Sequence, residues 1–116
     1  MTVHDSALAA LRTRLPDAIP DYSAIAGGET VIDWPPERLL DGYIALVECG
    51  IPVHLSAITA LPQAAGTLLL YHLWIDGGLT LRVDCPDNEA PSLTPLLPAA
   101  NWYEREAHDM LGVRFD

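Results

Sequence analysis

The chain has 116 residues, half of them hydrophobic, and its 6 basic residues against 16 acidic ones give a formal net charge of −10. This length and apolar content suit a single domain, residues 1–116, whose core needs neither disulfides nor a structural metal. The basic residues are all arginines scattered singly along the chain. Binding to nucleic acid or to an anionic membrane surface is therefore not expected, because both depend on clustered cations.

The N-terminal third predicts a helix, a strand and a second helix. The first helix is capped by Asp5 or Thr2 and stops at Pro16. Its apolar face consists of Leu8, Leu11 and Leu15. The β-branched run 29–34 predicts a short strand. Two prolines, Pro35 and Pro36, then favour the start of a second helix. That helix ends at Gly50 and places on one face Leu39, Tyr43, Leu46 and Val47.

The middle of the chain predicts three strands, over residues 51–59, 67–76 and 79–85. A two-residue turn at Gly77 and Gly78 makes the last two a hairpin in which partner numbers sum to 155. This register puts His72 on the core face, where we expect a buried and hydrogen-bonded imidazole, and we expect the same of His54. The strand 67–76 is apolar on both faces and is predicted to be central, whereas 79–85 is predicted to lie nearer an edge.

The uncharged stretch 49–75 is long enough to cross a bilayer, but Pro52, Pro62 and two histidines argue for buried protein core instead. The two cysteines, Cys49 and Cys85, form no CxxC or CxxH motif. We therefore expect both cysteines to be small hydrophobic residues of the core. We expect no iron-sulfur cluster or zinc finger to be held within this chain.

Four prolines in the thirteen residues from Pro86 to Pro98 predict an extended connection without regular structure. A last helix is predicted to open at Asn101, with Glu104 completing a capping box, and to stop before Gly112. The element order αβαβββα indicates an α+β fold with helices against a small, mostly antiparallel sheet.

Two stripes run along this last helix. The first, expected to pack on the sheet, consists of Tyr103, Ala107, Met110 and Leu111. The second consists of Trp102, Glu106 and Asp109, and Arg105 is spaced to pair with Asp109. On its own, such a charged stripe is typical of a solvated, salt-bridged helix face.

The stretch 95–115, PLLPAANWYEREAHDMLGVRF, resembles the signature of the 30 kDa subunit family of respiratory complex I, W-P-A-A-x-W-x-E-R-E-x-x-D-M-F-G-I-x-F. It departs from that pattern at His108, Leu111 and Val113. The residues that match position for position are Pro98, Ala99, Ala100, Trp102, Glu104, Arg105, Glu106, Asp109, Met110, Gly112 and Phe115. The strand motifs YHLW and LRVDCP also match, and the basic tail that usually follows in the family is expected to be absent after Asp116.

The resemblance implies a cofactor-free accessory subunit of the peripheral arm of an NADH:quinone oxidoreductase, not catalytic on its own. It implies docking on the large 49 kDa-type quinone-site subunit and on iron-sulfur subunits, at the cytoplasmic face of the inner membrane and without a membrane span. Partner-binding residues carried over from the motif are Trp102, Glu104, Arg105, Glu106 and Asp109. Trp and Arg are common interface anchors, which suits this role.

Two alternatives stay open at this point. The homologous domain of membrane-bound energy-converting [NiFe] hydrogenases and formate hydrogenlyases shares the same motif. A stand-alone metal-dependent enzyme would use Glu104 and His108, which lie four residues apart on one helix face, with a third ligand from His4, His54 or His72. Such a site is incomplete without that third ligand, since catalytic zinc usually has three protein ligands.

Overall fold

The computed structural model describes residues 9, 11–13, 24–26, 29–48, 50, 53–75 and 77–116. Its centre is a five-stranded sheet in the order β1-β2-β5-β4-β3. The strands are β1 (Ala24–Ala26), β2 (Glu29–Asp33), β3 (His54–Pro62), β4 (Thr67–Trp74) and β5 (Gly78–Cys85). Neighbouring strands are antiparallel except for β2 and β5, which pair in parallel. The predicted α+β class with a mostly antiparallel sheet is confirmed.

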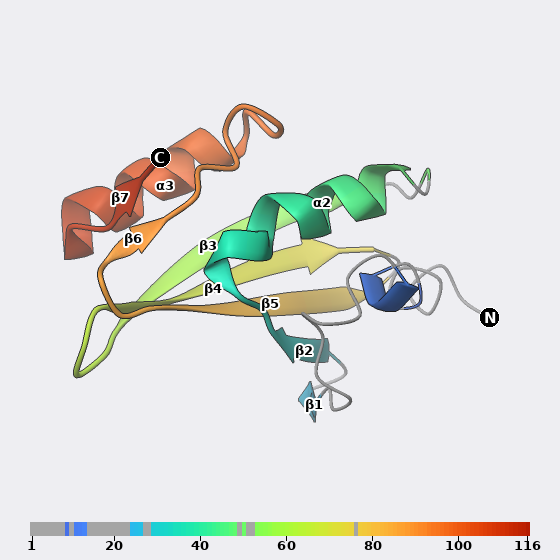
Figure 1. Ribbon diagram of the computed structural model, residues 1–116, viewed down its shortest axis with the longest axis horizontal. Helices are drawn as coiled ribbons and strands as arrows, with labels where there is room; N and C mark the ends of the chain where they lie inside the picture. Colours follow the sequence, from blue (N-terminus) through green and yellow to red (C-terminus); the bar gives the residue numbers. More distant parts are fainter. Residues whose placement is uncertain are drawn as a thin grey trace.

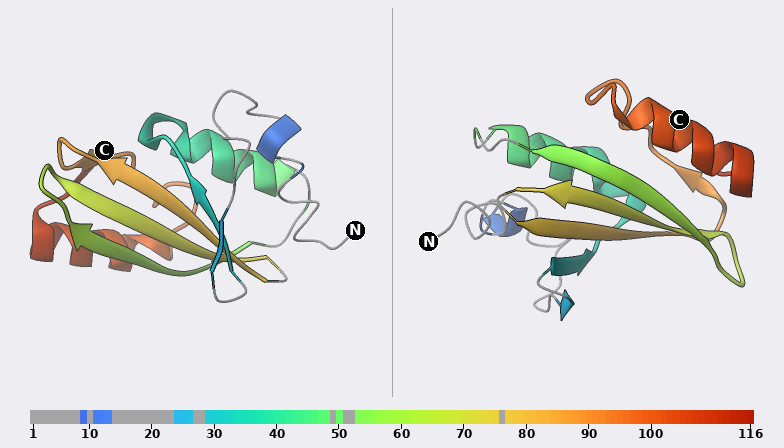
Figure 2. Two further views of the ribbon diagram at one scale, coloured as in Figure 1. Left: turned by 90° about the horizontal axis from the view of Figure 1, so that it is seen from below. Right: turned by 180° about the vertical axis from the view of Figure 1, so that it is seen from behind.

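The remaining elements lie around this sheet. A 3-10 turn, η1 (Pro36–Arg38), leads into α2 (Leu39–Glu48), and α3 (Ala100–Leu111) follows later. Two short strands, β6 (Glu89–Ala90) and β7 (Arg114–Phe115), form a separate parallel pair. Both α2 and α3 cover the same face of the sheet (Figures 1 and 2). The core therefore fills the space between that face and the two helices.

The predicted first helix is described only in part. Residues 11–13 are helical and Leu11 is fully buried. Its predicted cap, its end at Pro16 and the other two leucines lie outside the described residues, as does Cys49. Within the part of the chain that the structure describes, no helix has the length and apolar character needed to span a membrane.

The entry into α2 follows the proline signal. Pro35 is extended and Pro36 occupies the first turn of η1. The buried indole of Trp34 donates from Nε1 to the carbonyl oxygen of Arg38 at 2.8 Å. Gly42 allows this close packing, because a Cβ there would lie 2.5 Å from the Trp34 ring.

The predicted apolar face of α2 is correct for Leu39 and Leu46, which are buried, but wrong for Val47, which is 49% exposed. Tyr43 packs at the margin of the core. Gly50 has φ +70° and its N–H bonds to the carbonyl oxygen of Val47, which confirms the predicted left-handed end of this helix.

The predicted register of the β4–β5 hairpin is wrong by three residues. Observed partners sum to 152, as in Thr67 with Cys85 and Trp74 with Gly78. Gly78 belongs to β5, and the connection is 75–77, closed by a bond from the Ile75 N–H to the Gly77 carbonyl oxygen. An odd shift exchanges the faces of a strand relative to its neighbour. The buried partners of Leu79, Leu81 and Val83 are consequently Leu73, Tyr71 and Leu69.

His72 accordingly lies on the sheet face that the helices do not cover. Its Nε2 is 3.0 Å from the hydroxyl of Thr59 on β3, and its Nδ1 is 3.1 Å from the hydroxyl of Thr80 on β5. The imidazole is thus hydrogen bonded, as expected, but it is half-buried and not on the core face. His54 is exposed, so the prediction of a buried imidazole is wrong there.

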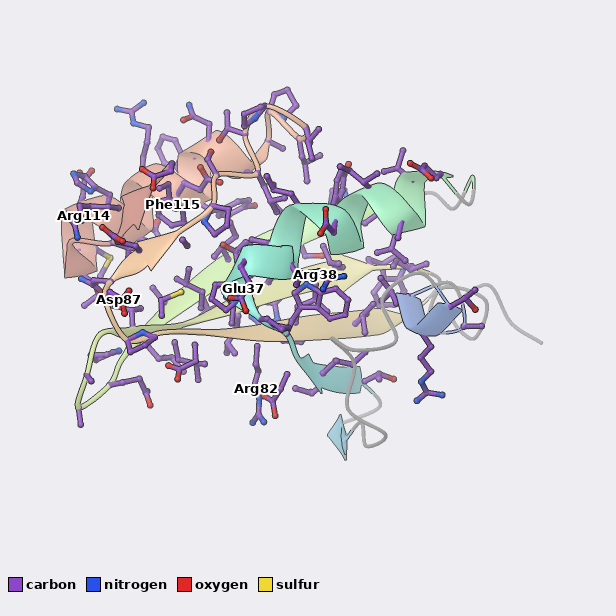
Figure 3. The ribbon with its side chains drawn as sticks, viewed as in Figure 1. Glu37, Arg38, Arg82, Asp87, Arg114 and Phe115 are labelled. Carbon is purple, nitrogen blue, oxygen red and sulfur yellow. The ribbon has the colours of Figure 1, made fainter. Side chains whose placement is uncertain are left out.

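The predicted position of residues 79–85 near an edge is also wrong. β5 lies in the middle of the sheet, because β2 returns from the N-terminal third to pair with it. β4 is interior, as predicted, and β3 is an edge strand. On the uncovered face, the β2–β5 contact carries an ion pair between Asp33 and Arg82, whose Nη2 lies 2.6 Å from Oδ1. Figure 3 shows Arg82 directed away from the helices.

The uncharged stretch that includes β3 and β4 forms strands over its described part, 53–75, in agreement with the prediction of protein core. The proline-rich connection, predicted to lack regular structure, contains β6. Glu89 and Ala90 lie between Pro86 and Pro91, so their own backbone groups are free to pair with β7.

Candidate functional site

The candidate site is built on α3, the helix that contains the charged motif. The helix starts at Ala100, and its N-cap residue, Ala99, makes no side-chain cap bond. The capping box predicted from Asn101 and Glu104 is therefore wrong. The predicted end before Gly112 is confirmed, because this glycine adopts the left-handed conformation and its N–H bonds to the carbonyl oxygen of His108.

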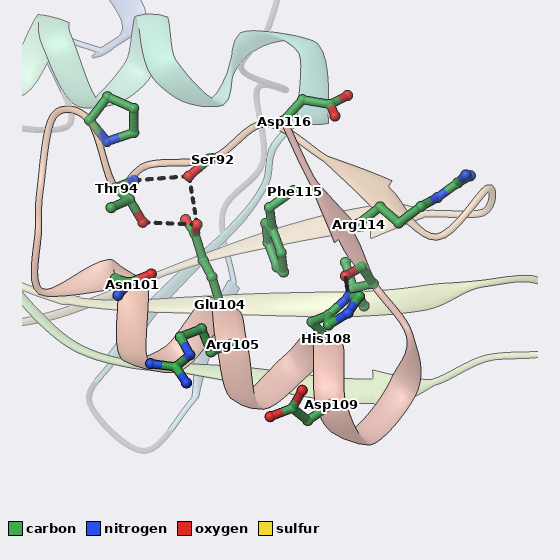
Figure 4. Close-up of a pocket in the computed structure, with 12 residues that line it drawn as sticks. Ser92, Thr94, Asn101, Glu104, Arg105, His108, Asp109, Arg114, Phe115 and Asp116 are labelled. Atoms are coloured by element: carbon green, nitrogen blue, oxygen red, sulfur yellow. Dashed lines mark hydrogen bonds between the residues drawn. The ribbon is translucent and has the colours of Figure 1, made fainter.

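Glu104 is the internal anchor of α3. Its side chain is only 5% exposed and accepts hydrogen bonds from the Ser92 hydroxyl at 2.6 Å, the Leu93 N–H at 2.8 Å and the Thr94 hydroxyl at 3.0 Å. Figure 4 shows this carboxylate pointing from the helix into the loop before it. A buried carboxylate needs such donors, and bonds to a charged acceptor are stronger than neutral ones. The loop fixes the helix here, in place of an N-cap.

Asn88 is a second residue that holds α3 in place. Neither the motif nor the hydrophobic periodicity of the sequence indicated this role. Its Nδ2 donates to the carbonyl oxygen of Leu111 at 2.8 Å, and its Oδ1 accepts from the hydroxyl of Thr67. Its own carbonyl oxygen accepts from the Arg114 N–H at 2.8 Å. Asn88 therefore ties β4, the end of α3 and β7 together. The signal for it was the sequence Pro-Asp-Asn at 86–88, since Asn tolerates the left-handed conformation that it adopts here, φ 61°.

The face of α3 that packs on the sheet is mostly the predicted stripe. Ala107 is buried, Leu111 is half-buried, and the hydroxyl of Tyr103 donates to the carbonyl oxygen of Ser56 on β3 at 2.9 Å. The prediction is wrong for Met110, which is 75% exposed. Met110 lines both a groove shared with β3 and the exposed surface of α3.

The opposite face of α3 is exposed and carries the second stripe. Trp102 is 70% exposed, and Arg105, Glu106 and Asp109 are exposed beside it. With Met110 they line a shallow depression of about 330 Å³. Among the residues that the structure describes, Arg105 and Asp109 do not form the ion pair that their spacing allows. We call this surface the outer face of α3.

Four of the five motif residues expected at a partner interface therefore share one surface. The fifth, Glu104, points away from that surface into the 92–94 loop. It can affect the surface only indirectly, by holding α3 in place. A larger groove of about 740 Å³ runs along the other flank of α3 (Figure 4). Its walls mix both signs of charge, from Arg105 and Arg114 to Asp109 and Asp116.

The two residues proposed as a metal pair are already engaged. All three donors of the 92–94 loop converge on the Glu104 carboxylate, and His108 Nδ1 is 2.9 Å from the carbonyl oxygen of Val113. The described part of the chain contains no group of three or more His, Cys, Asp or Glu residues placed to hold a metal ion.

Cys85 behaves as a core residue, as predicted, with 1% exposure. Burial, with a smaller contribution from Asp84 and then Asp87, raises the pKa of its thiol to about 11. The thiolate that ligates metals or attacks electrophiles is therefore disfavoured at neutral pH.

Comparison with known proteins adds to this geometry. The family model described as "Respiratory-chain NADH dehydrogenase, 30 Kd subunit" matches residues 32–116, a range that includes all of α3. The C-type subunit of the NADH-quinone oxidoreductase of Leptothrix cholodnii is 39% identical over 105 residues, covering 83% of this chain and 48% of that protein. A C-type subunit of the same enzyme from Rhizobium etli is 31% identical over 123 residues, covering 92% and 62%. The chain thus spans about half to three-fifths of the length of these relatives.

Some relatives are fused proteins. The fused C/D-type subunit of the NADH-quinone oxidoreductase of Methylococcus capsulatus is 41% identical over 61 residues, covering 48% of this chain and 10% of that protein. Among solved structures, the trypsin-resistant fragment (1-134) of Nqo5 superposes with a TM-score of 0.77 at 23% identity, covering 99% of this chain and 96% of that one.

A chain of the membrane-bound sulfane sulfur reductase, an archaeal respiratory membrane complex, superposes with a TM-score of 0.73 at 23% identity, covering 97% of this chain and 70% of that one. These two structural likenesses show the α+β fold. The family model covers well over half of the sequence and includes the motif that first indicated the resemblance. The chain therefore belongs to the family of the 30 kDa subunit of the respiratory-chain NADH dehydrogenase.

Proposed function

We propose that this chain is an accessory subunit of the peripheral arm of an NADH:quinone oxidoreductase, and that it docks on the large quinone-site subunit through the outer face of α3. The observation that carries the proposal is the exposure of Trp102 and Met110, 70% and 75%, on a helix that is fixed from inside. Large exposed apolar side chains rimmed by charges are typical of protein interfaces. A rigid helix also loses little conformational freedom on binding.

Each motif residue then has a role. Trp102 is the apolar anchor, and Arg105, Glu106 and Asp109 supply charged contacts around it. Glu104 acts as a positioning residue, because its bonds to the 92–94 loop set the rotation of α3 about its axis. Truncating Trp102 should affect association directly, whereas truncating Glu104 should affect it through the fold.

The fused relatives support the choice of partner. A protein named as a fused C/D subunit contains both parts in one chain, so the two parts stay near each other in that protein. We propose the same neighbourhood for this chain, with iron-sulfur subunits nearby, at the cytoplasmic face of the membrane. We further propose that it contributes no redox centre. The sequence has only two cysteines, and the thiol of Cys85 is buried.

The energy-converting hydrogenase alternative rests on the shared motif, because the archaeal membrane complex that superposes on this chain is named a sulfane sulfur reductase and, at 23% identity, shows the fold alone. Sequence relatives named as subunits of NADH-quinone oxidoreductase favour the quinone-reducing complex. The genes beside this one discriminate between them: a NADH-oxidising flavoprotein gene favours the first and a nickel-binding large subunit the hydrogenase. The metal-enzyme alternative loses support from the bonds that Glu104 and His108 already make.

The test is co-purification of the tagged, full-length gene product from its host, with identification of the partners by mass spectrometry. We expect Trp102→Ala and Glu106→Ala to weaken association with the large subunit at least tenfold. Val47→Ala is a matched control, because Val47 is also an exposed apolar helix residue but lies on α2. Unchanged association of the folded Trp102→Ala protein would refute the docking role.

A further inference from the structure

β3 is an edge strand whose middle lacks the usual protection. Among the described residues it pairs only with β4, which leaves alternate N–H and C=O groups on its other side without a sheet partner. Edge strands are normally protected by charged residues, prolines or bulges. β3 has a register irregularity between Leu55 and Ala57 and a proline at position 62, but the five residues between them, AITAL, carry no charge.

α3 limits this open edge at one end. The Tyr103 hydroxyl bonds to the carbonyl oxygen of Ser56, where the strand is irregular. Pro62 limits the other end, because it has no N–H to offer. The open length, Ala57–Leu61, is about 17 Å at the usual rise of a strand. It fits an extended segment of about five residues.

A groove runs beside the open edge. Its volume is about 360 Å³, with one wall from β3 and the other from α3. Figure 2 shows α3 following β3 on the helix-covered side of the sheet. The side chains of Ala60, Ala107, Met110 and Leu111 make the groove mainly apolar. A strand added to β3 would direct every second side chain into it.

The charge at the groove restricts the occupant further. Glu106 is the single charged residue among the described residues that line it, and its carboxylate has no ion-pair partner among them. Glu106 and Met110 also belong to the outer face of α3, so the groove and that face are continuous. A basic side chain beside Glu106 complements both the local charge and the net charge of −10.

We infer that an extended segment of the partner protein adds to β3 along Ala57–Leu61 as a further strand, with alternating apolar side chains in the groove and a Lys or Arg beside Glu106. The inference rests on the proposed function, since it specifies how the same partner is held. Main-chain hydrogen bonds supply affinity in this mode, and the groove supplies specificity.

The test compares backbone amide exchange of the full chain, alone and in its co-purified complex, by mass spectrometry. We expect amides within 57–61 to exchange at least tenfold more slowly in the complex. Ala60→Glu, which puts a charge into the groove, should weaken binding at least tenfold. Leu61→Ser should weaken it less than threefold, because this change leaves the edge strand uncharged and Leu61 does not line the groove.

The outcomes separate the two proposals. Weakened binding by Trp102→Ala with unchanged exchange at 57–61 overturns the added strand and leaves docking through α3 in place. Concentration-dependent protection of 57–61 in the isolated chain would mean that a second copy of this chain binds to the edge of β3. This outcome also overturns the added strand from the partner protein. If Trp102→Ala has no effect and 57–61 stays unprotected, both proposals fail. Should Ala60→Glu not fold, the exchange measurement on the natural chain decides alone.

Discussion

Glu104 and Glu106 are the same residue type, two positions apart on one helix, yet their surroundings are opposite. Two residues correspond to about 200° of rotation, so one faces the 92–94 loop and the other faces out. Glu104 is 5% exposed and accepts three hydrogen bonds, whereas Glu106 is exposed and unpaired among the described residues. The motif thus combines a residue that fixes the helix with residues that the fixed helix displays.

The largest expected effect tests the buried side of this comparison. Glu104→Ala should lower the free energy of unfolding by about 3 kcal/mol, because the Ser92, Leu93 and Thr94 donors lose a charged acceptor in a buried place. Glu106→Ala, its matched control, should change it by less than about 0.5 kcal/mol. Chemical denaturation of the two variants measures both values. Equal losses would mean that the contrast in burial has no energetic meaning.

Asn88 sharpens the comparison at the other end of α3. Asn88→Ala should cost about 2 kcal/mol, because two side-chain hydrogen bonds disappear and alanine tolerates a positive φ poorly. Asn88→Gly loses the same side-chain hydrogen bonds, but glycine adopts a positive φ without strain. It should therefore cost roughly 1 kcal/mol less than Asn88→Ala. A denaturation series of the two variants separates these contributions. If glycine is no better than alanine, the backbone conformation is not part of the effect.

High pH probes the core beneath α3. Burial, with smaller contributions from Glu104 and then Cys85, raises the pKa of Tyr71, and burial raises that of Cys85 to about 11 from 9.0. Both groups keep their protons to a higher pH in the folded state than in the unfolded state. The stability that Cys85 contributes is therefore complete below pH 9 and is lost as the pH rises towards 11, whereas the loss from Tyr71 begins near its ordinary pKa of 10.0 and continues above pH 11. Cys85 alone should account for about 1 kcal/mol by pH 10.

Thermal melts at several pH values measure this loss, and two variants isolate it. Cys85→Ala should flatten the curve between pH 9 and 11. Tyr71→Phe should flatten it above pH 10 and cost little at neutral pH, because the Tyr71 hydroxyl is buried without a hydrogen-bond partner among the described residues. An unchanged alkaline limb in both variants would assign the loss to other groups.

The smallest effect on stability is expected at the outer face of α3. Met110→Ser removes a side chain that is 75% exposed and should change the free energy of unfolding by less than about 0.5 kcal/mol. Denaturation measures the stability, and binding to the co-purified partner measures the function. A large loss of stability would show that Met110 packs on β3 after all, as its helical spacing first predicted.

Local signals in the sequence predicted helix boundaries of α2 and α3 correctly. The prolines at 35 and 36 and the glycines at 50 and 112 marked helix ends correctly, because they act through backbone conformation alone. The motif also identified the family. None of these features depends on contacts with residues that are distant in the sequence.

Long-range arrangement was harder to predict. The run TLLLYHLW is apolar at nearly every position, so it does not reveal which face is inside, and a turn placed three residues away moved His72 off the core face. The parallel pairing of β2 with β5 left no local trace. For Glu104, the donors that determine its burial lie in an irregular loop, where periodicity carries no information.

The parallel contact of β2 with β5 has a consequence for the order of folding. The strands β3, β4 and β5 connect through short turns, whereas Asp33 and Arg82 are 49 positions apart. Closing a long loop costs entropy before its contacts form. We expect the three-strand meander to be structured in the folding transition state and β2 to dock late. Ile32→Val should then mainly speed unfolding, and Leu69→Ala should mainly slow folding, in stopped-flow measurements.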